Sequence, residues 1–90
     1  MVTGIVLVNV ERPMLRSVIN EVSKIKGVTE VFTVAGEYDL VVMVRVKNNN
    51  ELSDAVANKM AHDIKGISHT KTLISLEATS SFDLEKIYLS

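Results

Sequence analysis

The chain has 90 residues, and its ten basic and eleven acidic side chains give a formal net charge of −1 at pH 7. It lacks the basic excess of nucleic-acid-binding domains, which argues against direct binding of nucleic acid. The sequence contains no cysteine, which excludes disulfides, thiolate catalysis and cysteine-based zinc sites. A chain of this length forms one domain that buries only roughly 60–65% of its unfolded surface, so association often stabilises it.

The sequence shows no targeting or membrane segment. Its first residues lack the charged start and long apolar core of a secretion signal. No run reaches the ~18 apolar residues that a membrane-spanning helix needs. We therefore expect a cytoplasmic protein without membrane contact.

Residues 5–10 form the first predicted strand, and both alternating sets of its side chains are apolar. One set holds Ile5 and Leu7, and the other holds the three valines at positions 6, 8 and 10. A strand of this kind needs cover on both faces. The pattern does not say which set faces the partner in a dimer.

The first predicted helix begins near Pro13, because proline suits the first helical position. Its apolar stripe, at helical spacing, consists of Leu15, Val18, Ile19, Val22 and Ile25. Gly27 then ends the helix. This stripe predicts a helix that packs on the core.

Residues 28–33 and 41–46 are two apolar runs rich in valine, which predict strands. The link between them contains Gly36, which accepts positive φ, and Asp39, which bonds nearby backbone N–H groups. These features predict a β-hairpin with its turn at residues 34–40.

A second predicted helix follows a polar loop. Asn49 or Asn50 is expected to cap it, with Glu51 at its positive end. Its apolar positions are four residues apart and are Leu52, Val56, Met60 and Ile64. Residues 70–77 form the fourth predicted strand, and one face of it carries Thr70, Thr72, Ile74 and Leu76.

The predicted order of elements is β-α-β-β-α-β, and residues 25–29 (IKGVT) recur in similar form as residues 64–68 (IKGIS). Two such halves predict an α+β, ferredoxin-like sandwich with a four-stranded antiparallel sheet and both helices on one face. The other face keeps apolar side chains, so we expect dimerisation through this open sheet face. For the tail, residues 78–90, a short helix, an edge strand and a swapped arm stay open.

These features together resemble the effector-binding domain, or RAM domain, of the Lrp/AsnC family of prokaryotic regulators. The similarity covers about residues 5–77 and is most specific in the segments 25–28, 34–40, 64–67 and 70–72. Full-length members carry an N-terminal helix-turn-helix domain, whereas this sequence starts in its first strand. The resemblance therefore implies a stand-alone effector domain over residues 1–90.

In that family the domains pair through their sheets, the dimers commonly form rings of four, and a small amino acid binds between dimers. The resemblance implies a homodimer or octamer that responds to an amino-acid effector and associates with itself or with full-length Lrp/AsnC regulators. The binding residues that it carries over are Gly36, Glu37, Tyr38 and Asp39 from the turn, with Thr70 and Thr72 from the last strand. Backbone N–H groups and hydroxyls suit the ligand carboxylate, and the Asp39 carboxylate suits its ammonium.

Two other interpretations stay open. Small dimeric ferredoxin-like barrels include monooxygenases and isomerases, but the predicted core layer offers no polar residue for such chemistry. ACT-like allosteric domains also bind amino acids at interfaces, and the Gly-x-Tyr-Asp turn favours the RAM resemblance over them. Because His62 and His69 have no partner at metal-ligand spacing, we expect no catalytic residue, metal site or cofactor, and not an enzyme.

Overall fold

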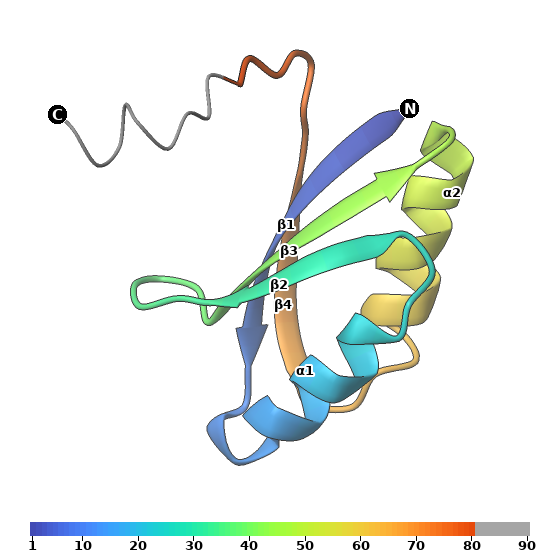
Figure 1. Cartoon of the computed structure of the whole chain (residues 1–90). Coiled ribbons are helices and arrows are strands. Elements are labelled where there is room, and N and C mark those ends of the chain that lie inside the picture. Colours follow the sequence, from blue (N-terminus) through green and yellow to red (C-terminus); the bar gives the residue numbers. More distant parts are fainter. Residues whose placement is uncertain (81–90) are drawn as a thin grey trace, which may run out of the picture.

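The computed structural model describes residues 1–80 as one antiparallel sheet with its helices on one face (Figure 1). The strands are β1 (Val2–Val10), β2 (Val28–Thr33), β3 (Leu40–Val46) and β4 (Ile67–Ile74). They lie in the order β2-β3-β1-β4, with antiparallel pairing throughout. The helices are α1 (Leu15–Ser23), after a 3₁₀ turn η1 (Arg12–Met14), and α2 (Asn49–Ser53), which continues as a π-helix η2 (Asp54–Met60). The predicted β-α-β-β-α-β order and ferredoxin-like fold are confirmed.

The core lies between the sheet and the two helical segments. On β1 the buried side chains are Val6, Val8 and Val10, and on β3 they are Leu40, Val42, Val44 and Val46. The helices contribute Val18, Val22, Leu52, Ala55 and Met60. The structure thus decides a choice that the alternating pattern of β1 left open: the valines face the helices, and Ile5 and Leu7 face the other way.

The second helical segment begins one residue earlier than the sequence predicted. Asn48 is its N-cap, and its side-chain oxygen accepts the Glu51 N–H at 2.9 Å. The Glu51 carboxylate in turn accepts the Lys47 N–H at 3.1 Å, a reciprocal arrangement close to a capping box. The prediction of Asn49 or Asn50 as the cap was wrong, because both already have helical positions.

The same segment widens into π-helical geometry after Ser53. The Ala61 N–H donates to the Val56 carbonyl at 2.8 Å, and the Asp63 N–H donates to the Asn58 carbonyl at 3.1 Å. Such i→i+5 bonds enlarge each turn beyond the ~3.6 residues of an α-helix. Apolar side chains spaced by four residues therefore stay on the core face, which explains the regular spacing in the sequence.

Strand β4 starts and ends three residues earlier than predicted. Thr70 and Thr72 do share a face, since they pair with Val8 and Val6 of β1. Leu76 does not belong to that face, because it lies beyond the strand and is 98% exposed. The tail predictions concern residues 78–90, of which 78–80 form neither helix nor strand and the rest lie outside the described residues.

Gly27 and Gly66 have φ of +98° and +105° and come directly before β2 and β4. The prediction that Gly27 ends the first helix was wrong, because α1 already ends at Ser23 and a separate turn leads from there to Gly27. A Cβ at Gly66 would lie 2.6 Å from the Met14 Cβ. A Gly66→Ala variant therefore combines backbone strain with a steric clash.

We expect Gly66→Ala to lower the free energy of unfolding by about 2–4 kcal/mol. The matched control is Gly36→Ala, because Gly36 has φ of +147° but no atom within 4 Å of a Cβ. This control should lose only about 1 kcal/mol, from strain alone. Urea unfolding of both variants measures the difference, and equal losses would contradict the steric argument.

Candidate functional site

The turn between β2 and β3 is tied to the end of β1 through Asp39. The Asp39 Oδ2 accepts the Val10 N–H at 2.8 Å, and the Asp39 N–H donates to the Val8 carbonyl at 2.9 Å. The Asp39 carbonyl accepts the Val34 N–H at 3.0 Å and closes the turn. Since backbone pairing between β1 and β3 stops at Leu40, the Asp39 carboxylate serves Val10 in place of a backbone carbonyl.

A hollow of about 460 Å³ lies between this turn and the junction of β1 with η1. From the turn it is lined by Thr33, Val34, Ala35, Gly36, Tyr38 and Asp39, and from the junction by Val10, Arg12 and Leu15. We call it the turn pocket. Three of the predicted binding residues thus meet in one place, whereas Glu37 is exposed and does not line the pocket.

The junction residues were not predicted as part of a site. They come from a different segment, which the turn meets because β1 pairs directly with β3. Only a predicted strand order would have indicated that the end of β1 and the hairpin turn lie at the same end of the sheet.

Thr70 and Thr72 do not line the turn pocket of their own protomer. They face the helices from β4, on the far side of β1 from β3. Two strand spacings place Thr70 roughly 10 Å from Leu40, at the base of the turn. Thr72 instead lines a small hollow of about 260 Å³ beneath α2. A shared site would need these threonines to come from another copy of the chain.

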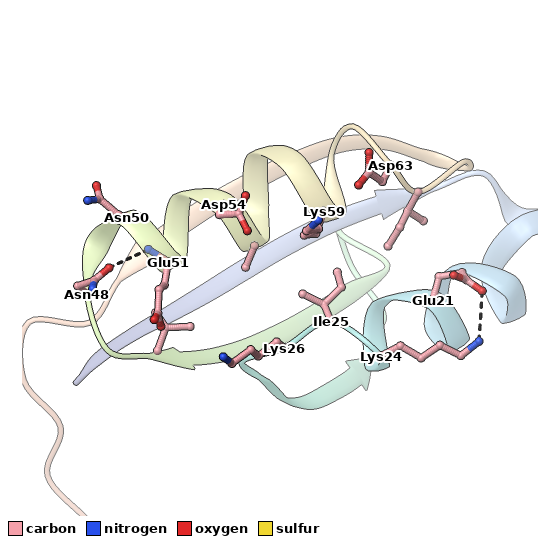
Figure 2. A pocket seen from close by; sticks show the side chains of 13 residues that line it. Glu21, Lys24, Ile25, Lys26, Asn48, Asn50, Glu51, Asp54, Lys59 and Asp63 are labelled. Carbon is pink, nitrogen blue, oxygen red and sulfur yellow. Dashed lines mark hydrogen bonds and ion pairs between the residues drawn. The ribbon is translucent and has the colours of Figure 1, made fainter.

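A wider groove, of about 700 Å³, lies between the end of α1 and the segment formed by α2 and η2 (Figure 2). Some of its polar side chains have a partner, either within the groove or beside it. Glu21 pairs with Lys24 at 3.5 Å, and the Asn58 amide donates to Asp54 at 2.8 Å. The groove therefore presents a mixed and exposed set of charges, and the turn pocket is the stronger candidate site.

Neither histidine lines any of these three hollows. His62 is exposed and contacts the neighbouring Asp63 at 2.9 Å, and His69 is exposed on β4. Within residues 1–80, no three His, Asp or Glu side chains are grouped as a metal site would need. In the same part of the chain, no helix has the length and apolar character to span a membrane.

The face of the sheet opposite the helices has an apolar centre, which we call the open face. Its central residues are Ile5 and Leu7 of β1 and Val41 and Met43 of β3, and the edge strands add Phe32 and Leu73. Phe32 and Leu73 are 48% and 44% exposed. A 2.8 Å ion pair between Arg45 and Glu30 lies at the rim. An apolar centre with a polar rim is the usual anatomy of a protein–protein interface.

Comparison with known proteins decides the family. The model of the Lrp/AsnC ligand binding domain matches residues 3–83. This chain belongs to the Lrp/AsnC family. An HTH-type transcriptional regulator from Pyrococcus abyssi is 39% identical over 62 residues, which are 69% of this chain and 41% of the regulator. The chain thus spans about two fifths of the length of such regulators.

Other relatives show how widely this Lrp/AsnC domain occurs. Homocitrate synthase from Sulfurisphaera tokodaii is 39% identical over 61 residues, 68% of this chain but 13% of the enzyme. The crystal structure of TTHA0845 from Thermus thermophilus has a TM-score of 0.83 and 31% identity, and the match covers 90% of this chain and all of that one. Escherichia coli AsnC shares the fold, with a TM-score of 0.83 at 22% identity, over 91% of this chain and 55% of its own.

Membership of the family confirms the resemblance found in the sequence. A ligand-binding domain of transcriptional regulators also confirms the choice of a binding module over a barrel enzyme. The identity of the ligand, the site residues and the mode of assembly stay predictions.

Proposed function

We propose that this Lrp/AsnC domain binds a small amino acid at the turn pocket and serves as an amino-acid-responsive module in transcription regulation. The observation that carries the proposal is the anchored carboxylate of Asp39, which lines a hollow of suitable size beside the Gly36 backbone. Among proteins with the same fold, the regulator NMB0573 from Neisseria meningitidis was solved as an L-Met complex. That precedent supports an amino acid as the ligand class.

The chemistry of Asp39 suits the ammonium group of an amino acid. An ionised carboxylate offers about four lone-pair sites, and the Val10 N–H takes one of them. The bond to Val10 also holds the carboxylate in place, so little ordering is needed when a ligand arrives. A charge-assisted bond of this kind strengthens where water is excluded, which favours a site closed by a second copy.

Other copies of the chain contribute in two ways, by forming the dimer and by joining dimers. The open face pairs two protomers into a homodimer, which removes its apolar centre from water. Further association of dimers, as in a ring of four, brings Thr70 and Thr72 of one dimer near the turn pocket of another. Full-length Lrp/AsnC regulators offer the same association surfaces, so the module acts through them. With its net charge of −1, this domain contributes no DNA-binding surface of its own.

Replacing Asp39 separates its binding role from its structural role. Asp39→Asn keeps an oxygen that accepts the Val10 N–H but loses the negative charge, whereas Asp39→Ala loses both. We expect both variants to lose about 2–4 kcal/mol of amino-acid binding free energy. We expect only Asp39→Ala to lose about 1–2 kcal/mol of folding free energy.

Calorimetry with a panel of the twenty amino acids measures the binding, and thermal unfolding measures the stability. If Asp39→Asn binds the ligand as tightly as the wild type does, Asp39 has only a structural role. If no amino acid binds the wild type at millimolar concentration in any oligomeric state, the proposed function fails.

A second candidate is favoured by the match to homocitrate synthase. There the domain would regulate an enzyme, as ACT-type domains do, and the same pocket would bind the effector. The two candidates differ in the partner. An amino acid that changes operator binding by a co-purified Lrp/AsnC regulator supports the transcriptional role, and no change in that assay supports the enzyme-linked one.

A further inference from the structure

The turn pocket carries two opposite charges from two different segments of the chain. Asp39 comes from the β2–β3 turn, and Arg12 comes from η1 at the end of β1. No ion pair joins them, and none within residues 1–80 involves Arg12. A cation and an anion that line one hollow without pairing leave room for a ligand that carries both charges.

The backbone on both sides of Arg12 is held in place. The Glu11 N–H donates to the Gly66 carbonyl at 2.8 Å, and the Met14 N–H donates to the Glu11 carbonyl at the same distance. Pro13 restricts φ at the next position. Two residues before Arg12, Val10 donates to the Asp39 carboxylate. The backbone of Arg12, from which its side chain extends, is therefore held in a fixed position relative to the Asp39 carboxylate.

The remaining walls of the pocket are largely apolar. The apolar residues are Val10, Leu15, Val34 and Ala35, and Thr33, Gly36 and Tyr38 complete the lining. Arg12 and Asp39 are the only charged side chains that line it in the described structure. A second charge on the ligand side chain would therefore find no partner within the protomer, and its desolvation would be uncompensated.

From this arrangement, and resting on the proposed function, we infer that Arg12 binds the α-carboxylate of the effector while Asp39 binds its ammonium. The effector is then an α-amino acid with an uncharged aliphatic side chain, which packs against Val10 and Leu15. The planar guanidinium suits a carboxylate because it donates two parallel N–H bonds. In this arrangement the binding of the effector's α-carboxylate does not depend on Thr70 and Thr72.

The test compares wild type, Arg12→Gln and the control Arg16→Gln by calorimetry. Arg16 is an exposed arginine of α1 that does not line the pocket. The probes are the tightest binder among L-valine, L-leucine and L-methionine, and its carboxamide, which keeps the size but lacks the negative charge. We expect the wild type to bind the amino acid roughly 10–100-fold more tightly than its carboxamide.

In Arg12→Gln this preference should fall to within about threefold, because the partner of the negative charge is gone. Arg12→Lys keeps the positive charge but cannot donate two parallel N–H bonds, so its preference for the amino acid should be intermediate. Arg16→Gln should show the same preference as the wild type. An unchanged preference in Arg12→Gln overturns the inference. So does a tenfold tighter binding of L-lysine or L-glutamate than of all three aliphatic probes. An effector that is lost with Asp39→Asn but retained with Arg12→Gln refutes this inference alone, whereas no binding to the wild type refutes the proposed function.

Discussion

A Val8→Asp substitution is expected to unfold this domain. Val8 has no exposed surface and lies between Leu40 and Thr70 in the middle of the sheet, beneath the helices. An unpaired carboxylate there costs on the order of 5 kcal/mol or more, to which lost packing adds. A domain of this size has only about 5–10 kcal/mol of stability. The substitution therefore removes most or all of it.

Circular dichroism and thermal unfolding measure the result. The matched control is Leu7→Asp, the same chemical change one residue earlier on the opposite face of β1. A cooperative unfolding transition for Val8→Asp near that of the wild type would contradict the assigned orientation of β1. Equal destabilisation of both variants at concentrations where each is monomeric would contradict it as well.

Leu7→Asp is expected to dissociate the proposed homodimer and leave the protomer folded. Leu7 pairs with Val41 on one side and Lys71 on the other, at the centre of the open face. In a two-fold symmetric interface each protomer contributes one substituted residue, so two carboxylates lose their hydration when the dimer forms. A loss of about 2 kcal/mol for each raises the dimer dissociation constant by about 1000-fold.

Sedimentation over a range of concentrations measures this constant. The control is Ser17→Asp, which makes the same change of charge at an exposed position of α1. It should leave the dissociation constant within about threefold of the wild type, since it lies away from the open face. A wild-type chain that sediments as a folded monomer in dilute solution would refute the proposed dimer itself.

Much of the fold could be predicted because its signals are local. The stripe of α1 follows from helical periodicity. Gly27 and Gly66 mark the turns that lead into β2 and β4, because the chain there needs positive φ. The predictions that failed concern boundaries. Asn48 rather than its neighbours is the cap, and β4 ends before Leu76. Several adjacent residues satisfy the same local preference there, and tertiary contacts choose among them.

The sequence by itself determined the order of elements, the family and the hairpin turn with Gly36 and Asp39, because each depends on neighbouring residues or a short motif. Only the tertiary structure decided which face of β1 is buried, since alternation is symmetric when both sets are apolar. It also decided the composition of the turn pocket. The pairing of β1 with β3 brings Arg12 to the turn, and the position of β4 beyond β1 keeps Thr70 and Thr72 away. Such neighbours are far apart in the chain and are set by strand order and register, which a single sequence does not display.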